Sequence, residues 1–285
     1  MSQPASDPRT VLPPGIVNLA DHETHAASHL EPRAWAYFNG AAADEITLAA
    51  NRHAWDRMGL LPRVLRPLAG GHTRVELLGR TLAHPILLAP MAYQRMAHPD
   101  GELGAAYAAA ALGAGMVLST QASTRLEAVA NAIRDDVGRG PLWFQLYLQH
   151  DRDFTRELVE RAERAGYEAL VLTVDAPCHG ARDRERRAGF RLPTGISAVN
   201  LLGMLPAPEV PLAPGQSALF DGLLHHAPTW ADVQWLQSIT RLPVLLKGVL
   251  HPDDAREATN LGVAGIIVSN HGGRTLDTTP ATATQ

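Results

Sequence analysis

The chain has 285 residues, which is room for one large or two ordinary domains and for a core that buries most of the apolar surface. A formal net charge of −4 gives no electrostatic reason to expect nucleic acid or an anionic membrane as a partner. The single cysteine, Cys178, excludes an internal disulfide and fits a reducing compartment, so a cytoplasmic protein is expected. The start of the chain lacks the pattern of a signal peptide, and no apolar run approaches the roughly 20 residues of a membrane span.

The N-terminal part predicts a tail followed by a helix. Residues 1–17 are largely polar and proline-rich, and we expect them to precede a single domain over residues 18–285. Residues 18–30 have a helical pattern that carries three histidines. Nothing apolar surrounds these histidines and their spacing is not that of a zinc protease, so a solvated face is expected and no metal site.

A second helix and two extended pieces follow. Pro32 opens a helix that ends after Phe38 and carries Tyr37 close to its end. Residues 61–67 and 73–79 are expected to be extended, and the second segment alternates as a half-exposed hairpin strand does.

From residue 85 onwards, apolar runs alternate with helical patterns. The apolar runs cover residues 85–92, 115–121, 142–147, 169–175, 243–248 and 265–268. The helical patterns between them cover residues 101–112, 125–133, 152–165, 230–239 and 252–261. Such alternation predicts parallel βαβ units. A long proline-rich connection, residues 182–228, separates the fourth run from the next helix.

Polar side chains lie at or just past the carboxyl end of these runs. They include Tyr93, Ser119, Gln121, Gln145, Tyr147, Thr173, Asp175, Lys247 and His271. A ring of polar groups at the carboxyl ends of the strands is typical of a (β/α)8 barrel. A doubly wound sheet would gather its ligands at one switch point, usually after a glycine-rich turn. The sequence therefore predicts an α/β fold of the TIM (β/α)8-barrel type.

The last apolar run leads into a polar cluster. Residues 265–268 predict a strand buried on both faces, and two glycines then separate His271 from Arg274. Glycines let the backbone leave the strand so that both side chains can face one pocket. Imidazole suits proton transfer near neutral pH, and guanidinium offers a planar fork for a carboxylate or phosphate. The pair indicates a base beside an anion clamp, with a solvated histidine at an ordinary strand exit as the alternative.

Three charged residues can complete such a site. Asp175 can orient a base such as His271 and stabilise its charged form. Lys247 is costly to bury unless an anion meets it, which favours a place in the site. Arg182 could bind a carboxylate from the side opposite Arg274, although its run Ala-Arg-Asp-Arg-Glu-Arg-Arg predicts mostly solvated charges.

Neutral side chains add donors and acceptors. Tyr37 and Tyr147 can donate to oxygens, although packing of an aromatic ring at a helix end also explains Tyr37. Gln145 and Thr173 suit an amide-like edge such as a flavin ring. For Cys178 we favour an inert or partly buried thiol over a nucleophile.

Five segments resemble, in order and spacing, the FMN-dependent 2-hydroxy acid oxidases and dehydrogenases, a family that includes glycolate oxidase, lactate oxidase and mandelate dehydrogenase. The segments are Ala89-Pro-Met-Ala-Tyr-Gln-Arg-Met-Ala-His-Pro-Asp-Gly-Glu, Phe144-Gln-Leu-Tyr, Leu172-Thr-Val-Asp-Ala-Pro, Leu246-Lys-Gly-Val and Ser269-Asn-His-Gly-Gly-Arg-Thr-Leu-Asp. The resemblance runs from about residue 18 to residue 280, and its last segment is very specific.

The resemblance implies that FMN is the cofactor and that a small 2-hydroxy acid is oxidised to the 2-oxo acid. His271 would take the hydroxyl proton as the Cα hydrogen leaves for flavin N5, and Asp175 would hold the imidazolium. Arg274 and Arg182 would bind the substrate carboxylate. The resemblance does not decide between hydride and carbanion transfer. It also leaves open whether oxygen or a quinone or cytochrome is the final electron acceptor, and whether the protein is a homo-oligomer.

Further roles are implied in the same way. Tyr37 and Tyr147 would help to hold the substrate carboxylate and hydroxyl, and Lys247 would balance negative charge at N1 and O2 of the reduced flavin. The isoalloxazine would be lined by Ala89, Pro90, Met91, Ala92, Ser119, Gln145 and Thr173.

The chain departs from the family pattern in two ways. Gln121 stands where several members carry an aromatic residue near the substrate. The resemblance therefore does not identify the side chain of the substrate. The chain ends fourteen residues after His271, which predicts a barrel truncated after about six strands, without the Asp-Gly-Gly and Gly-Arg segments that grip the FMN phosphate in similar enzymes. The alternatives are a truncated, non-catalytic fragment unable to hold FMN and an FMN-dependent non-redox isomerase. The His-Gly-Gly-Arg carboxylate site argues against the isomerase.

Overall fold

The computed structural model describes residues 13–208 and 210–285, so most of the expected tail lies outside the described residues. The first two helices, α1 (Leu19–His29) and α2 (Pro32–Asn39), agree with the expected ones. A capping box starts α1, because the Asn18 side chain accepts from the Asp21 backbone and the Asp21 carboxylate accepts from the Asn18 backbone. Pro32 occupies the first turn of α2, where its missing N–H is not needed.

A third helix, α3 (Ile46–Asp56), was not expected from the sequence. It begins after Glu45, which has a positive φ of 62° and makes no capping hydrogen bond through its side chain. Its cap comes from the far end of the chain, where the Asp277 carboxylate accepts hydrogen bonds from the backbone N–H groups of Thr47 (2.8 Å) and Ile46 (3.2 Å). This contact joins α3 to the segment that carries His271.

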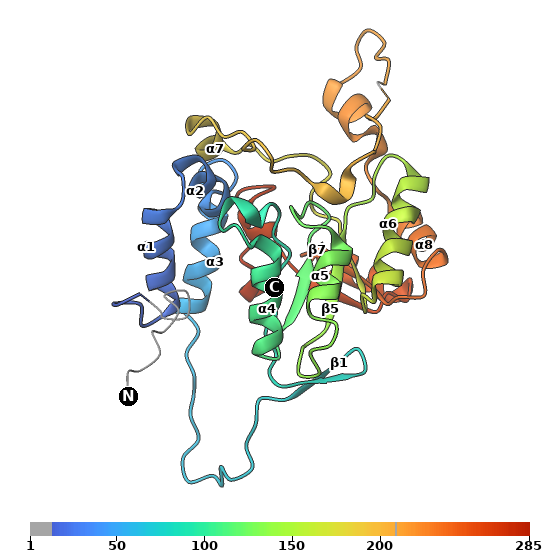
Figure 1. The fold of residues 1–285 in the computed structure, drawn as a ribbon. Coiled ribbons are helices and arrows are strands. Elements are labelled where there is room, and N and C mark those ends of the chain that lie inside the picture. Colours follow the sequence, from blue (N-terminus) through green and yellow to red (C-terminus); the bar gives the residue numbers. More distant parts are fainter. Residues whose placement is uncertain (1–12, 209) are drawn as a thin grey trace, which may run out of the picture.

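The predicted hairpin is present as β1 (Val75–Leu77) and β2 (Arg80–Leu82), which pair antiparallel. Residues 61–67 pair with no described strand. They belong to a long loop between α3 and β1 that reaches away from the body of the protein (Figure 1).

A six-stranded parallel sheet follows the order of the chain. Its strands are β3 (Leu87–Leu88), β4 (Gly115–Leu118), β5 (Leu142–Leu146), β6 (Leu170–Thr173), β7 (Val244–Val249) and β8 (Gly265–Val268). Sequential parallel order contains no switch point, so the prediction of a barrel-type sheet is confirmed and a doubly wound sheet is ruled out. Within the described residues β3 and β8 each pair with one strand only, and the sheet is an open half-barrel.

Helices follow the strands as predicted. They are α4 (Gly101–Ala111), α5 (Leu126–Ala132), α6 (Arg152–Ala165), α8 (Trp230–Ser238) and α9 (Pro252–Asn260), of which α4, α5, α6 and α8 are labelled in Figure 1. The connection over residues 182–228 carries α7 (Asp183–Arg187) and the short turns η2 (Val199–Leu201), η3 (Ala218–Gly222) and η4 (Leu223–His226). None of the described helices is long and apolar enough to cross a membrane.

Alternation along the strands produces two apolar layers. The larger contains Leu118, Phe144, Leu170 and Leu246 together with residues of α4, α5, α6 and α8. The smaller contains Val117, Trp143, Ala169, Val171 and Leu245. Successive strand residues point to opposite faces of a sheet, so the smaller layer fills the inside of the half-barrel.

The expectation that residues 265–268 form a strand buried on both faces is wrong. Ile266 is 37% exposed and Val268 is 41% exposed. The cause is topological, since β8 pairs only with β7 and forms an edge of the described sheet.

Candidate active site

The inner row of the sheet continues directly into polar residues. Two residues beyond Val117, Trp143, Val171 and Leu245 stand Ser119, Gln145, Thr173 and Lys247, all of them buried. The two-residue period of a strand therefore places these four polar groups on the inner face, at the carboxyl edge of the sheet.

Hydrogen bonds connect three of these groups across neighbouring strands. Gln145 Nε2 donates to Thr173 Oγ1 (3.0 Å), and Ser119 Oγ donates to Gln145 Oε1 (3.2 Å). The Thr120 backbone N–H also donates to Gln145 Oε1 (3.2 Å). Burial together with these contacts holds the amide in one orientation.

A cavity of about 760 Å³ opens over this edge of the sheet. It brings together every predicted site residue except Asp175, which does not line the cavity but contacts His271. Its walls include Tyr37, Ala89, Pro90, Met91, Ala92, Ser119, Gln145, Tyr147, Thr173, Arg182, Lys247, His271 and Arg274. Gln121 and Cys178 also line it, as do Leu201, Leu223 and His226 from the long connection.

His271 and Asp175 form a close pair at the cavity wall. The Nδ1–H of His271 donates to Asp175 Oδ1 over 2.7 Å. This assigns the proton to Nδ1 and leaves Nε2 as the acceptor, with the Tyr147 hydroxyl 3.4 Å from it. The solvated-histidine alternative for His271 is therefore wrong for this structure.

The backbone holds His271 in an uncommon conformation. Its φ is +56°, in the left-handed region that residues other than glycine seldom adopt. The preceding Asn270 exchanges two hydrogen bonds with Asn51 of α3 (2.7 and 3.0 Å) and accepts from the Gly273 backbone (3.2 Å). Sequence reasoning missed this amide pair, because its members are 219 residues apart.

The second oxygen of Asp175 is buried and accepts no hydrogen bond from any described residue. Gly248, at a bulge in β7, packs against this carboxylate so tightly that an added Cβ would lie 2.5 Å from Asp175 Cγ. The backbone at Gly248 therefore limits where the Asp175 carboxylate can lie, in addition to the contact with His271.

The two arginines meet at a third charged residue. Glu185 Oε1 accepts hydrogen bonds from Arg182 Nη1 (2.9 Å) and Arg274 Nη2 (3.1 Å). The Arg182 side chain is only 17% exposed and that of Glu185 only 14%, whereas Arg186 is 78% exposed. The expectation of mostly solvated charges in this run therefore fails for Arg182 and Glu185. The role of Glu185 was missed from the sequence.

Backbone carbonyls also hold the guanidinium of Arg274. Its Nη1 donates to the carbonyls of Tyr37 (2.6 Å) and Gly40 (2.5 Å) at the end of α2, and its Cζ lies 4.9 Å from the centre of the Tyr37 ring. Arg182 Nε donates in turn to the Arg274 carbonyl (2.9 Å). Gly180 lets this loop approach, since an added Cβ would lie 2.5 Å from the carbonyl oxygens of Arg274 and Thr275.

Burial shifts the titration of several groups that line the cavity. It raises the pKa of Tyr37 to about 12 against the opposing effect of Arg274, and it also raises the pKa of Tyr147. Both phenols therefore stay protonated at neutral pH and can donate hydrogen bonds. Burial lowers the pKa of Lys247, while Asp175 acts in the opposite direction.

Glu102 links two of the loops that border the cavity. This fully buried carboxylate accepts hydrogen bonds from the Ser123 backbone (2.7 Å), the Thr124 hydroxyl (2.7 Å) and the Gln94 backbone (3.1 Å). The loop after β3 and the loop after β4 therefore share one anchor. Sequence reasoning did not identify it, because Glu102 reads as an ordinary acidic residue in the first turn of α4.

Replacing Glu102 with glutamine is expected to lower the free energy of unfolding by about 2 kcal/mol or more. The N–H groups of the glutamine amide would face the N–H and O–H groups that now donate to the carboxylate. At least one buried N–H or O–H would then lack an acceptor. Urea denaturation measures the change. Glu76→Gln on the exposed hairpin is the control and should stay within about 0.5 kcal/mol. A loss as small as that of the control would show that the loops do not depend on this anchor.

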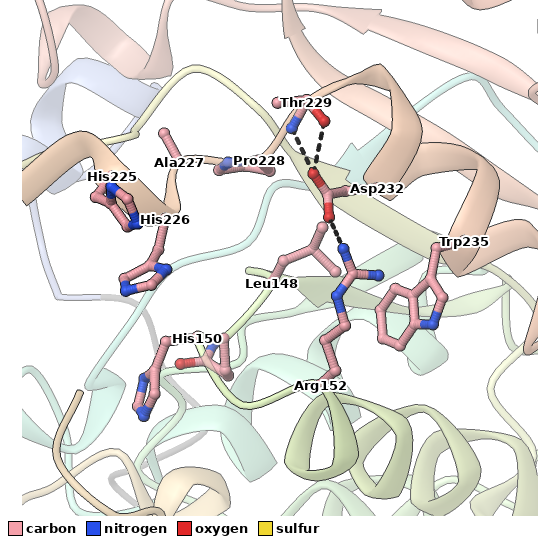
Figure 2. Close-up of a pocket in the computed structure, with 11 residues that line it drawn as sticks. Leu148, His150, Arg152, His225, His226, Ala227, Pro228, Thr229, Asp232 and Trp235 are labelled. Carbon is pink, nitrogen blue, oxygen red and sulfur yellow. Dashed lines mark hydrogen bonds and ion pairs between the residues drawn. The ribbon is translucent and has the colours of Figure 1, made fainter. Parts of the chain in front are cut away.

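A second cavity of about 290 Å³ adjoins the first, and six residues line both: Leu148, Gln149, His150, His226, Ala227 and Pro228. Figure 2 shows His150, His225 and His226 on one side, with Arg152, Asp232 and Trp235 opposite. Arg152 is already paired with Asp232, and its guanidinium carbon lies 4.5 Å from the centre of the Trp235 ring.

Comparison with known proteins identifies relatives of this chain. L-lactate oxidase of Alicycliphilus denitrificans is 48% identical over 276 residues, which cover 96% of this chain and 74% of that protein. Glycolate oxidase 3 of Arabidopsis thaliana is 41% identical, over 94% of this chain and 72% of that protein. The structure of mandelate oxidase with (S)-2-phenylpropionate superposes with a TM-score of 0.79 at 40% identity, over 92% of this chain and 70% of that one.

A further solved structure, a mandelate oxidase variant with a C4a-OH-FMN adduct, matches with a TM-score of 0.79 at 38% identity, over 92% of this chain and 72% of that one. Residues 26–285 match the family described as FMN-dependent dehydrogenase. The expected family is thereby confirmed, and the chain belongs to the FMN-dependent dehydrogenases, within which its relatives are 2-hydroxy acid oxidases.

Proposed function

We propose that this chain oxidises a small 2-hydroxy acid to the 2-oxo acid with FMN as the immediate electron acceptor. The observation that carries the proposal is that His271, paired with Asp175, lines the same cavity as Arg182 and Arg274. A base with a free ring nitrogen beside two guanidiniums suits a substrate that has a hydroxyl next to a carboxylate.

The described residues fit the ring system of FMN. The cavity volume of about 760 Å³ lies in the range of cofactor sites. Ser119, Gln145 and Thr173 offer buried neutral polar atoms that suit the polar edge of an isoalloxazine, and Lys247 offers a positive charge beside them. FMN, when bound, supplies the acceptor for the two electrons that leave the substrate carbon.

His271 and Asp175 would carry the proton chemistry. Nε2 of His271 would accept the hydroxyl proton of the substrate, because Nδ1 already carries the proton that it donates to Asp175. The imidazolium that results is stabilised by the adjacent carboxylate. The Tyr147 hydroxyl, 3.4 Å from Nε2, would donate to a substrate oxygen held at that position.

The arginines would bind and orient the acid. Each can offer two N–H groups to a carboxylate in a fixed plane, which a lysine ammonium cannot do. With the carboxylate held by Arg182 and Arg274, the hydroxyl on the neighbouring carbon would lie toward His271, which lines the same cavity.

The deciding experiment is the visible spectrum of the purified chain with and without added FMN, followed by anaerobic addition of glycolate, L-lactate or mandelate. Protein-bound flavin that bleaches with one of these acids is the expected result. A folded chain that holds no flavin would overturn the proposal and favour a non-catalytic fragment. Bound flavin that none of the acids bleaches would reject the substrate class.

Replacing Arg274 with lysine is expected to raise the KM for the 2-hydroxy acid at least about tenfold while the affinity for FMN stays within about twofold. A single ammonium cannot keep the contacts with Tyr37, Gly40 and Glu185 and also present a planar fork. Steady-state kinetics and flavin titration measure the two effects. Arg152→Lys, in the adjoining cavity, is the control. An equal loss of FMN binding would assign Arg274 to the cofactor site.

A further inference from the structure

Glu185 occupies an unusual position for a residue of a charged run. It belongs to α7, where Arg186 and Arg187 are 78% exposed, yet its own side chain is only 14% exposed. One of its oxygens, Oε1, accepts from both Arg182 and Arg274, at 2.9 and 3.1 Å. A single atom therefore fixes the spacing of the two guanidiniums.

The remaining contacts complete a rigid clamp. Arg182 Nε donates to the Arg274 carbonyl, and Arg274 Nη1 donates to two carbonyls at the end of α2. Within the described residues, Arg182 Nη2 and Arg274 Nε make no hydrogen bond, so donors on both side chains stay available to a ligand. The contacts with Glu185 thus fix the forks without using all of their donors.

Charge gives a second reason for this arrangement. Two guanidiniums held together in a partly buried site repel each other, and burial and Arg182 both lower the pKa of Arg274. Glu185 opposes that effect. Without the Glu185 carboxylate, the two arginines of the substrate-free protein would move apart. The substrate would then have to order them again, and the free energy of that ordering would weaken binding.

We propose that Glu185 is a positioning residue of the carboxylate clamp: its Oε1 holds Arg182 and Arg274 at the spacing that receives a substrate carboxylate. The inference rests on the proposed function, in which the two arginines bind that carboxylate. Glu185 itself does not line the cavity, so it acts through the arginines.

Geometry and charge predict opposite effects, which makes the proposal testable. Removing a negative charge near an anion site should tighten anion binding if charge alone matters. Removing the shared acceptor should weaken binding if position matters. Glutamine removes the charge and keeps an oxygen that can accept from both arginines, whereas alanine removes both features.

The experiment measures binding of oxalate, a carboxylate without a hydroxyl, to the full FMN-supplemented chain by titration calorimetry, together with KM and kcat for the best 2-hydroxy acid. Glu185→Ala is expected to raise the oxalate Kd and the KM at least about tenfold, with kcat within about threefold. Glu185→Gln is expected to leave the oxalate Kd unchanged or lower it. Glu45→Ala is the matched control, because Glu45 is the ion-pair partner of Arg184, which lies next to Glu185 on α7. This variant should change the Kd less than about twofold.

Several outcomes would overturn the inference. These are an oxalate Kd for Glu185→Ala within about twofold of the wild type, a loss equal to that of Glu45→Ala, or equal losses for the alanine and glutamine variants. If Glu185→Ala does not fold, Glu185→Asp decides instead, because its shorter side chain cannot reach both arginines and should raise the Kd. Failure of the wild-type chain to bind oxalate would remove the proposed function and this inference together, whereas wild-type binding with unchanged variants would remove this inference alone.

Discussion

Replacing His271 with glutamine is expected to lower the rate of 2-hydroxy acid oxidation by about 10³-fold while FMN stays bound. The loss follows from the position of Nε2, which faces the cavity as the unprotonated ring nitrogen because Nδ1 donates to Asp175. A glutamine amide fills a similar volume but cannot take a proton near neutral pH. The residues that fit the flavin ring, Ser119, Gln145 and Thr173, contact one another and do not depend on His271.

The measurement is anaerobic rapid mixing of the FMN-loaded variant with substrate, which follows flavin bleaching directly, with bound flavin counted from the spectrum before mixing. His226→Gln is the control, because this exposed histidine lines the same cavity without contacting Asp175 and should keep the wild-type rate within about threefold. Bleaching at the wild-type rate in His271→Gln would show that another group is the base. Loss of flavin would place His271 in the cofactor cradle.

The sequence was sufficient for those parts of the site that depend on local periodicity. Residues 142–147 were expected to form a strand, and the strand is present as β5. Two-residue alternation within it points Trp143 to the inner layer and so puts Gln145 at the rim. The same reasoning holds for Thr173 and Lys247, which follow Val171 and Leu245. Because the parallel strands lie in chain order, these rim groups come together, and the sequence pattern is enough to predict it.

The sequence was not sufficient where the contact joins distant segments. The cap of α3 comes from Asp277, 230 residues beyond Thr47, so the start of this helix carries no local signal. Glu185 lies in a run of charges whose pattern predicts solvation, and only the packing of α7 against α2 and the contact with Arg274 show that its side chain is largely shielded from solvent. The exposure of Ile266 was likewise set by topology, because β8 has a described partner on one side only.

Gly248→Ala is expected to lower kcat by about 100-fold, although residue 248 does not line the cavity. An added Cβ would lie 2.5 Å from Cβ and Cγ of Asp175 and 2.8 Å from its Oδ2, closer than non-bonded atoms approach. Lys247 and Val249 on either side hold Gly248 in β7, so Asp175 is the group that must move. Its displacement breaks the 2.7 Å contact with His271 Nδ1, and the imidazole then loses both its orientation and the charge that stabilises its protonated form.

Strain in the backbone must be separated from this effect, because Gly248 has a φ of +112° and alanine is disfavoured there whatever its neighbours. Gly262→Ala supplies the comparison, since Gly262 also has a positive φ (+70°) but no atom within 4 Å of an added Cβ. Gly262→Ala should lose about 1 kcal/mol of stability in thermal unfolding from the positive φ alone, and Gly248→Ala should lose more because of the added clash. Only Gly248→Ala should lose kcat, and its flavin content should equal that of the wild type. Equal kcat in the two variants would mean that the position of Asp175 does not control the reactivity of His271.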